Sequence, residues 1–371
     1  KGMPTLNFRI DGQELEVRQS DPYNRGLLWP QRFAVTLCGE RDSVLRVNMT
    51  DTLVRIQLPF VPSLVLPNTD GRGYGLFVPD ESALKWLLAH WWEVKDDTAR
   101  QSLLMTLYEN YLAKHISADD WTNSLLAGLP AEKNALVAST VSGYLAGAMR
   151  RVAPAQIAEV EARVYAISRN HPLPSCRVQL LRYFMQNATS QPMVKELYAL
   201  WQEQSDKRLN QQDYTTLAYE LAIRLPAESE QILRTQRARI DDPDRLRRFD
   251  FISRAVVSDT ARLDTLFNSL LVAENRRIEP WTVAVIRYLN HPLREEQSVK
   301  YIRPGLEVLE EVQRTGDIFF PKNWASALLG NHLSRPAYEE VVRFLDGHPD
   351  YSPLLKNKIL QAAYSLYREN D

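Results

Sequence analysis

The chain has 371 residues, of which 44% are hydrophobic and 25% charged, a composition typical of a globular protein with room for two or more domains. Its 45 basic and 46 acidic residues give a net charge of -1, which excludes a global field that would attract nucleic acid or an anionic membrane. No apolar run approaches the roughly 18 residues that span a bilayer, so we expect no nucleic-acid partner and no membrane span.

The first 79 residues follow the period of a β-strand. Apolar and polar residues alternate from Leu6 to Ile10 and again from Leu15 to Val17, on either side of an Asp11-Gly12 turn. Asp-Gly between two alternating runs is a strong hairpin signal. About seven short strands, each with one apolar face, predict a small antiparallel β-sandwich over residues 1–79. The five further strands are expected at residues 33–37, 44–49, 53–58, 63–66 and 74–78.

From residue 80 to residue 371 the period becomes that of a helix. Leu84, Leu87, Leu88 and Trp91 have the i, i+3, i+4, i+7 spacing that places them on one helix face. The same spacing recurs along the chain and predicts roughly fifteen helices of about 10–18 residues. Strict sequence repeats are absent, so we expect degenerate helical hairpins of the HEAT or armadillo type, stacked into a curved solenoid. The fold is therefore predicted to be mainly α.

No catalytic or metal-binding motif is found in the sequence. None of the six histidines has a second histidine four residues away, as the zinc helix of a thermolysin-like peptidase requires. His90 and Glu93 are three residues apart on an expected helix, and we interpret them as an ion pair on the helix face or as an amphipathic boundary beside Trp91 and Trp92. Cys38 and Cys176 lie in segments of different predicted type, which favours two free thiols over a disulfide. We expect no catalytic residue and no metal ligand in this chain.

The most basic segment runs from Arg245 to Arg254 on an expected helix. One interpretation is a solvated helix face with ion pairs at i, i+4. The other is that some of these arginines face the concave side of the solenoid and hold the carboxylate of a peptide, because a guanidinium fork matches a carboxylate. On this second interpretation the candidate substrate-binding residues are Arg248, Arg254 and Arg287.

The junction between the two regions resembles a known family. Residues 66–77, with the sequence LPNTDGRGYGLF, end the strand region and lead into the first long helix. They resemble the segment of aminopeptidase N-like metallopeptidases in which an Asn, a Gly and a Tyr close a β-sandwich domain before a helix that bears a Trp. Trp86 matches that tryptophan, whereas Gly75 departs from the family's Tyr-Arg-Val. Compatible segments occur at residues 15–19, 28–37, 99–103 and 317–324.

The resemblance implies that the chain is the C-terminal part of a bacterial zinc aminopeptidase, with a helical domain like that of the endoplasmic reticulum aminopeptidases. In that family the exopeptidase loop, the zinc helix and the last zinc ligand belong to domains that would precede residue 1. The fragment is then a non-catalytic substrate cap, inactive alone, and the zinc belongs to the parent enzyme. Its implied partners are a peptide substrate and the missing N-terminal catalytic domain.

Two other hypotheses remain open from the sequence. The chain could be a helical-repeat scaffold that binds another protein on its concave face, or a stand-alone hydrolase with an unconventional site. A coding sequence without a His-Glu-x-x-His helix upstream of Lys1 would argue against the peptidase hypothesis. The sequence predicts a soluble protein and leaves the compartment open between cytoplasm and periplasm.

Overall fold

The computed structural model describes residues 2–370 of the chain. They form two compact units, of which the first ends at Met193 and the second begins at Val194. The change from strands to helices falls earlier, between Val78 and Glu81. The strands therefore share a unit with the first helices, and a separate domain that ends at residue 79 stays a prediction.

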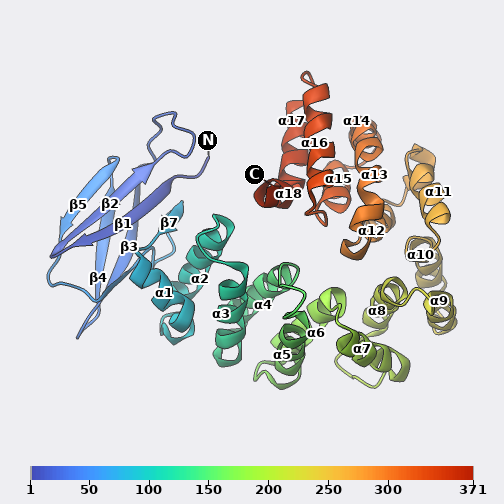
Figure 1. The fold of residues 1–371 in the computed structure, drawn as a ribbon, viewed down its shortest axis with the longest axis horizontal. Coiled ribbons are helices and arrows are strands. Elements are labelled where there is room, and N and C mark those ends of the chain that lie inside the picture. The colour runs from blue at the N-terminus through green and yellow to red at the C-terminus, as the bar shows by residue number, and fades with distance from the viewer. Residues whose placement is uncertain (1, 371) are drawn as a thin grey trace. The chain divides into compact units, whose positions relative to one another are not determined.

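Seven strands form two facing sheets at the start of the first unit, as the period-two pattern predicts (Figure 1). One sheet has four strands in the order β5-β2-β1-β7, and the other has three in the order β4-β3-β6. The strands are β1 (Thr5–Asp11), β2 (Glu14–Ser20), β3 (Gln31–Cys38), β4 (Ser43–Met49), β5 (Leu53–Gln57), β6 (Leu64–Leu66) and β7 (Leu76–Val78).

The two sheets enclose an apolar core in which three phenylalanines meet. The rings of Phe33 and Phe77 are 5.1 Å apart edge to face, and Phe8 lies 6.2 Å from Phe33. One pairing differs from the expected antiparallel arrangement, because β7 runs parallel to β1, with Leu6 opposite Phe77. A parallel pair needs a long connection, and the chain between β1 and β7 supplies it by passing through the other five strands.

Helices make up the remainder of the first unit, and α7 begins just before its end. Each of several helices starts at a side-chain cap, such as Asp96 before α2 and Asn134 before α4. Neighbouring helices pack in pairs, α3 on α4 and α5 on α6. The helices are α1 (Glu81–His90), α2 (Asp97–Leu112), α3 (Ala118–Gly128), α4 (Ala135–Met149), α5 (Ile157–Asn170), α6 (Pro174–Asn187) and α7 (Gln191–Glu203).

The second unit is entirely helical. In it α8 packs on α9, and two columns follow, one of α12, α15 and α17 and one of α13, α16 and α18 (Figure 1). Its further helices are α8 (Gln211–Arg224), α9 (Ser229–Ala238), α10 (Pro243–Ser253), α11 (Thr260–Leu270), α12 (Glu279–Leu289), α13 (Glu295–Glu307), α14 (Leu309–Thr315), α15 (Phe320–Leu329), α16 (Arg335–Gly347), α17 (Pro353–Ala362) and α18 (Tyr364–Asn370).

Residues 2–370 contain eighteen α-helices, whereas the sequence predicts roughly fifteen. Two of the extra helices arise because α14 and α18 follow α13 and α17 after a single residue. Pro304 lies inside α13, one turn before the first of these breaks. A proline removes one backbone hydrogen bond and bends the helix, so a continuous apolar pattern is divided in two.

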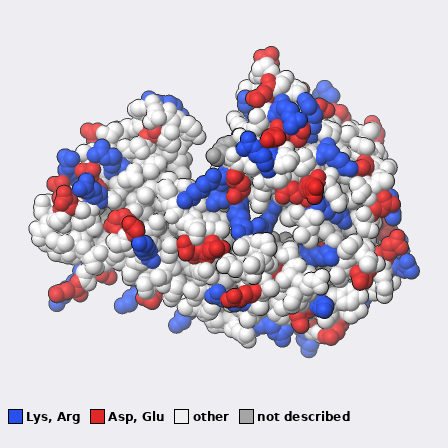
Figure 2. Space-filling view, viewed as in Figure 1, with Lys and Arg blue, Asp and Glu red and all other residues white. Residues whose placement is uncertain are grey.

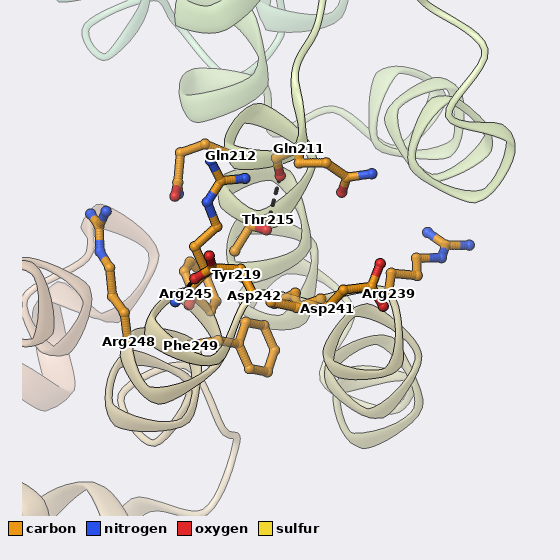
Figure 3. Close-up of a pocket in the computed structure, with 11 residues that line it drawn as sticks. Gln211, Gln212, Thr215, Tyr219, Arg239, Asp241, Asp242, Arg245, Arg248 and Phe249 are labelled. Carbon is orange, nitrogen blue, oxygen red and sulfur yellow. Dashed lines mark hydrogen bonds between the residues drawn. The ribbon is translucent and has the colours of Figure 1, made fainter.

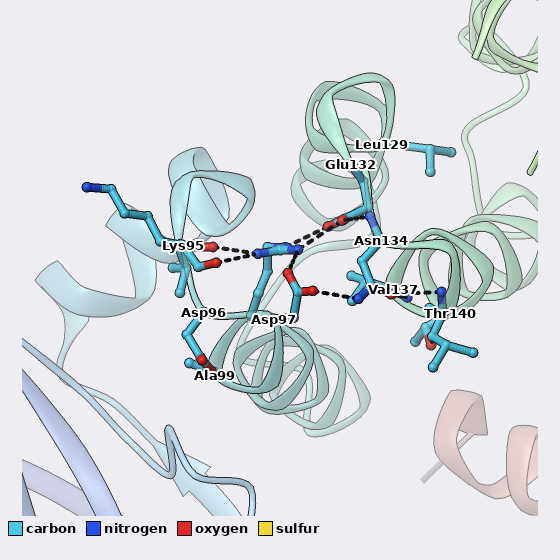
Figure 4. Close-up of polar contacts among 12 residues, drawn as sticks. Lys95, Asp96, Asp97, Ala99, Leu129, Glu132, Asn134, Val137 and Thr140 are labelled. Carbon is cyan, nitrogen blue, oxygen red and sulfur yellow. Dashed lines mark hydrogen bonds and ion pairs between the residues drawn. The ribbon is translucent and has the colours of Figure 1, made fainter. Parts of the chain in front are cut away.

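A buried ion pair joins α2 to the segment that precedes α4 (Figure 4). The guanidinium of Arg100 donates to both carboxylate oxygens of Glu132, at 2.6 and 3.0 Å, and to the backbone carbonyl of Val94 at 2.7 Å. Asp97 accepts from Arg100 and from the side chain of Asn134, which caps α4. This network fixes the start of α2 against the start of α4.

Gly143, in the interior of α4, offers a stability test. No heavy atom lies within 4 Å of the position that a Cβ would occupy there. Gly143→Ala is therefore expected to raise the free energy of unfolding of the first unit by about 1 kcal/mol, because alanine restricts the unfolded chain and favours the helix. Urea unfolding measures the change.

Gly128→Ala is the matched control for this prediction. A Cβ at Gly128 would come within 2.2 Å of the Trp91 ring, which is fully buried. Overpacking of this kind costs about 1–3 kcal/mol, so the two substitutions should shift the unfolding midpoint in opposite directions. Shifts of the same sign would contradict the packing described for these two helices.

Candidate functional site

A pocket of ≈ 200 Å³ lies between α8 and α10 in the second unit (Figure 3). Basic and acidic side chains are interspersed over the face shown in Figure 2, so overall charge does not mark a site. The pocket walls come from residues 211–219 of α8, the segment between α9 and α10, and α10 itself. The lining residues are Gln211, Gln212, Thr215, Tyr219, Arg239, Ile240, Asp241, Asp242, Arg245, Arg248 and Phe249.

The start of α10 positions two of the three arginines that line the pocket, Arg245 and Arg248. The carboxylate of Asp242 accepts hydrogen bonds from the backbone N–H groups of Asp244 and Arg245, at 3.0 and 2.8 Å, and so caps the helix. Arg245 and Arg248 are three residues apart and therefore share a helix face. Both extend from α10 toward the end of α8 that carries Gln211 and Gln212 (Figure 3).

A chain of hydrogen bonds holds the wall that α8 contributes. The indole N–H of Trp201 donates to Gln236 at 2.8 Å, and the Gln236 amide donates to the hydroxyl of Thr215 at 3.2 Å. That hydroxyl donates to the backbone carbonyl of Gln211 at 2.9 Å. Arg239 stacks over the Trp201 ring at 4.8 Å and donates to the Trp201 carbonyl, so its guanidinium is engaged.

The guanidinium groups of Arg245 and Arg248 have no hydrogen-bond or ion-pair partner among residues 2–370, and both side chains are exposed. Arg247, which lies between them, pairs with Asp244. In the basic segment, Arg247 is therefore paired within its helix at i, i+3, whereas Arg245 and Arg248 are unpaired and line a pocket. An oxyanion entering the pocket would meet two guanidinium groups that form no ion pair within residues 2–370, although the carboxylates of Asp241 and Asp242 also line this pocket.

Tyr219 lines the pocket and contacts a second tyrosine, Tyr288. Tyr219 stacks on Phe249 at 5.3 Å and meets Tyr288 of α12 edge to face at 5.5 Å. Burial raises the pKa of Tyr219, and the nearby positive charge of Arg248 opposes that rise. Burial likewise raises the pKa of Tyr288, where the charge of Arg287 acts in the opposite direction. Neither hydroxyl has a hydrogen-bond partner within the described residues.

The three predicted arginines lie in different places. Arg248 lines the pocket, and Arg287 lies near Tyr288, which contacts the pocket residue Tyr219. Arg254 is the exposed residue that ends α10, and it does not line this pocket. Sequence reasoning did not select Arg245, although its spacing from Arg248 and the Asp242 cap were visible signals. Gln211 and Gln212 also line the pocket. They could not be identified from the sequence, because their place in the pocket depends on how α8 packs against the segment that follows α9.

The histidines take structural positions. His90 stacks on Trp86 and interacts with its carbonyl at 3.0 Å, and among the described residues it forms no ion pair with Glu93. His291 lies 3.2 Å from Glu220 in the interior of the second unit, and its other ring nitrogen accepts from the Leu293 N–H. Nothing in the sequence spacing indicated this buried pair.

Two other kinds of feature, metal clusters and membrane-spanning helices, are not found in residues 2–370. This part of the chain contains no group of three or more His, Cys, Asp or Glu side chains that could hold a metal ion. None of its helices is both long and apolar enough to cross a bilayer. Cys38 and Cys176 are free, and burial raises the pKa of the Cys38 thiol to about 11.

Comparison of the chain with protein-family models gave no match, and comparison with curated proteins gave none either. The family resemblance of residues 66–77 therefore stays a prediction from the sequence.

Proposed function

We propose that this chain is a non-catalytic binding module that holds the C-terminal carboxylate of a peptide in the pocket between α8 and α10. The observation that carries the proposal is the pair Arg245 and Arg248, both unpaired within the described residues and both lining one pocket. Two guanidinium forks one helical turn apart can donate to both oxygens of a carboxylate. The free hydroxyl of Tyr219 is a further donor at the buried side of the pocket.

The acidic residues of the pocket do not cancel this positive charge at the same place. Asp242 is engaged by backbone N–H groups of α10. The side chain of Asp241 extends on the side of Arg239, away from Arg248 (Figure 3). A ligand carboxylate beside Arg248 is therefore attracted by two arginines on the side of the pocket away from Asp241 (Figure 3).

The resemblance of residues 66–77 suggests a larger enzyme around this module, in which it is the C-terminal substrate cap of a zinc aminopeptidase. In that setting the preceding domain would hold the zinc and remove N-terminal residues, while the module described here would hold the far end of the peptide. A helix with the sequence His-Glu-x-x-His encoded upstream of residue 1 is the expected companion. If the intact gene encoded no such helix, the chain would not be part of a zinc aminopeptidase. The proposal that the pocket binds a carboxylate would be unaffected, because a peptide titration tests it separately.

Amidation of a peptide's C-terminus tests the binding proposal directly. The 371-residue chain is titrated with an N-terminally labelled tetra-alanine peptide, as the free acid and as the amide, and fluorescence anisotropy is followed. We expect Arg248→Ala to weaken binding of the free acid about 10-fold, because one charge-assisted hydrogen bond contributes about 1.5–3 kcal/mol before solvent screening.

Arg247→Ala is the matched control, since it removes the same charge from the neighbouring position. Arg247 pairs with Asp244 on the exposed face and does not line the pocket, so its loss should leave both affinities within about 2-fold. Equal weakening by the two substitutions would mean that only the general basic charge of α10 attracts the peptide.

The scaffold hypothesis has one observation in its favour. The turn before α15 exposes Ile318 by 82% and Phe319 by 65%, which is unusual for side chains of this size. Tight binding of a folded protein that is lost in the double variant Ile318→Ser, Phe319→Ser and unaffected by Arg248→Ala would favour a scaffold over the peptide-binding module.

A further inference from the structure

A second candidate binding site lies in the first unit, on neighbouring faces of α2 and α4. We propose that Glu109, with the stacked rings of Tyr108 and Tyr144, binds an organic cation, the ammonium or guanidinium group of a basic side chain. The inference does not depend on the pocket of the second unit, and the ligand has the opposite charge.

The carboxylate of Glu109 is the anionic part of this site. It is half-buried and has no hydrogen-bond or ion-pair partner among residues 2–370. Burial raises the pKa of Glu109, and no neighbouring positive charge opposes that rise. A partly desolvated carboxylate without a cation is costly to the protein. A ligand cation beside it would supply the missing partner.

Aromatic rings form the other part of the site. Tyr108 of α2 and Tyr144 of α4 stack with their centroids 4.1 Å apart and their planes 15° from parallel. Trp121 of α3 lies behind them, fully buried, at 5.7 Å from Tyr144 and 6.2 Å from Tyr108. The charge of Glu109 acts on the Tyr144 hydroxyl, so carboxylate and rings are close together. Organic cations are attracted both to carboxylates and to aromatic faces.

Open space borders Tyr144 along α4. Gly143 precedes Tyr144 and Gly147 follows it by three residues, and at neither glycine would an added Cβ have a heavy atom within 4 Å. A larger side chain would therefore fit at either position without a clash, so close packing is not the reason that glycine occupies them. One turn before Glu109 on α2, Met105 is exposed. This apolar side chain can contact the aliphatic stem of a lysine or arginine while its charged end reaches Glu109.

The test is a ligand-observed NMR titration of the 371-residue chain with N-acetyl-lysine amide and, separately, N-acetyl-arginine amide. N-acetyl-norleucine amide, which is neutral and of similar length, is the control ligand. We expect both cations to bind and the neutral analogue to bind at least about 5-fold more weakly, because the charged interactions are lost. The ratio of the lysine and arginine affinities identifies which cation the site prefers.

Three variants connect binding to the proposed residues. Glu109→Gln keeps the shape of the side chain and should weaken cation binding about 10-fold, while Glu93→Gln, at an exposed position outside the site, should not change it. Gly147→Ala should weaken binding by occupying the open space, without loss of near-ultraviolet circular dichroism. Unchanged affinity in folded Glu109→Gln, or equal binding of the neutral analogue, would overturn the proposal.

Discussion

Replacing Glu132 with alanine is expected to destabilise the first unit by about 3–5 kcal/mol, because it removes the buried partner of Arg100 and leaves that guanidinium paired only with Asp97, whose side chain is 56% exposed. The side chains of Arg100 and Glu132 are only 8% and 1% exposed. The carboxylate accepts two hydrogen bonds from the guanidinium and a third from the Asn134 N–H at 2.6 Å. Its loss therefore affects both α2 and the start of α4.

The measurement is urea unfolding, combined with hydrogen exchange of peptides from α2 and α4 to assign the change to the first unit. Glu81→Ala is the control, since Glu81 is 82% exposed and its pair with Lys85 spans one helical turn. A pair of this kind contributes at most about 0.5 kcal/mol. If Glu132→Ala were as stable as Glu81→Ala, the ion pair would not hold the two helices together.

Trp324→Ala is expected to destabilise the second unit by about 3–5 kcal/mol, through loss of buried surface and creation of a cavity. The Trp324 ring is fully buried, packs edge to face on Phe320 at 5.9 Å, and donates from its indole N–H to the Gly305 carbonyl at 2.8 Å. That carbonyl follows Pro304, where the regular hydrogen bonding of α13 is interrupted. The indole thus satisfies a backbone acceptor in the interior.

Trp324→Phe separates packing from hydrogen bonding. Phenylalanine retains much of the buried ring but cannot donate to Gly305, so we expect a smaller loss of about 1–3 kcal/mol. Thermal and urea unfolding of the two variants provide the comparison. Equal stability of Trp324→Ala and the unsubstituted chain would show that α13 and α15 are held by other contacts.

The strands were predictable because each has one face in the core and one face in water. Alternation of apolar and polar residues records that arrangement directly, so Leu6, Phe8, Leu15 and Val17 are buried as expected. The parallel pairing of β7 with β1 was not predictable, since it depends on where the chain returns after five other strands. The number of helices was underestimated where a one-residue break leaves the apolar period intact.

The candidate sites depend on contacts that sequence spacing does not encode. Arg248 was selected from a run of arginines, but only the structure distinguishes it from Arg247, which is paired on the outer face. Glu109 carries no local signal, because its significance comes from the stacking of Tyr108 on Tyr144, 36 residues later in the chain. Contacts between residues this far apart in the sequence depend on how two helices pack together, and the periodicity within one helix does not reveal them.

A double-mutant cycle tests whether Arg248 contacts the carboxylate of a peptide. Four dissociation constants are needed, those of the unsubstituted chain and Arg248→Ala with the free-acid and amidated tetra-alanine peptides. We expect amidation to weaken binding to the unsubstituted chain more than binding to Arg248→Ala, in which only Arg245 remains to hold the carboxylate, with a coupling energy of about 1–3 kcal/mol. A coupling energy of zero would contradict this contact, because the arginine and the carboxylate would then act independently.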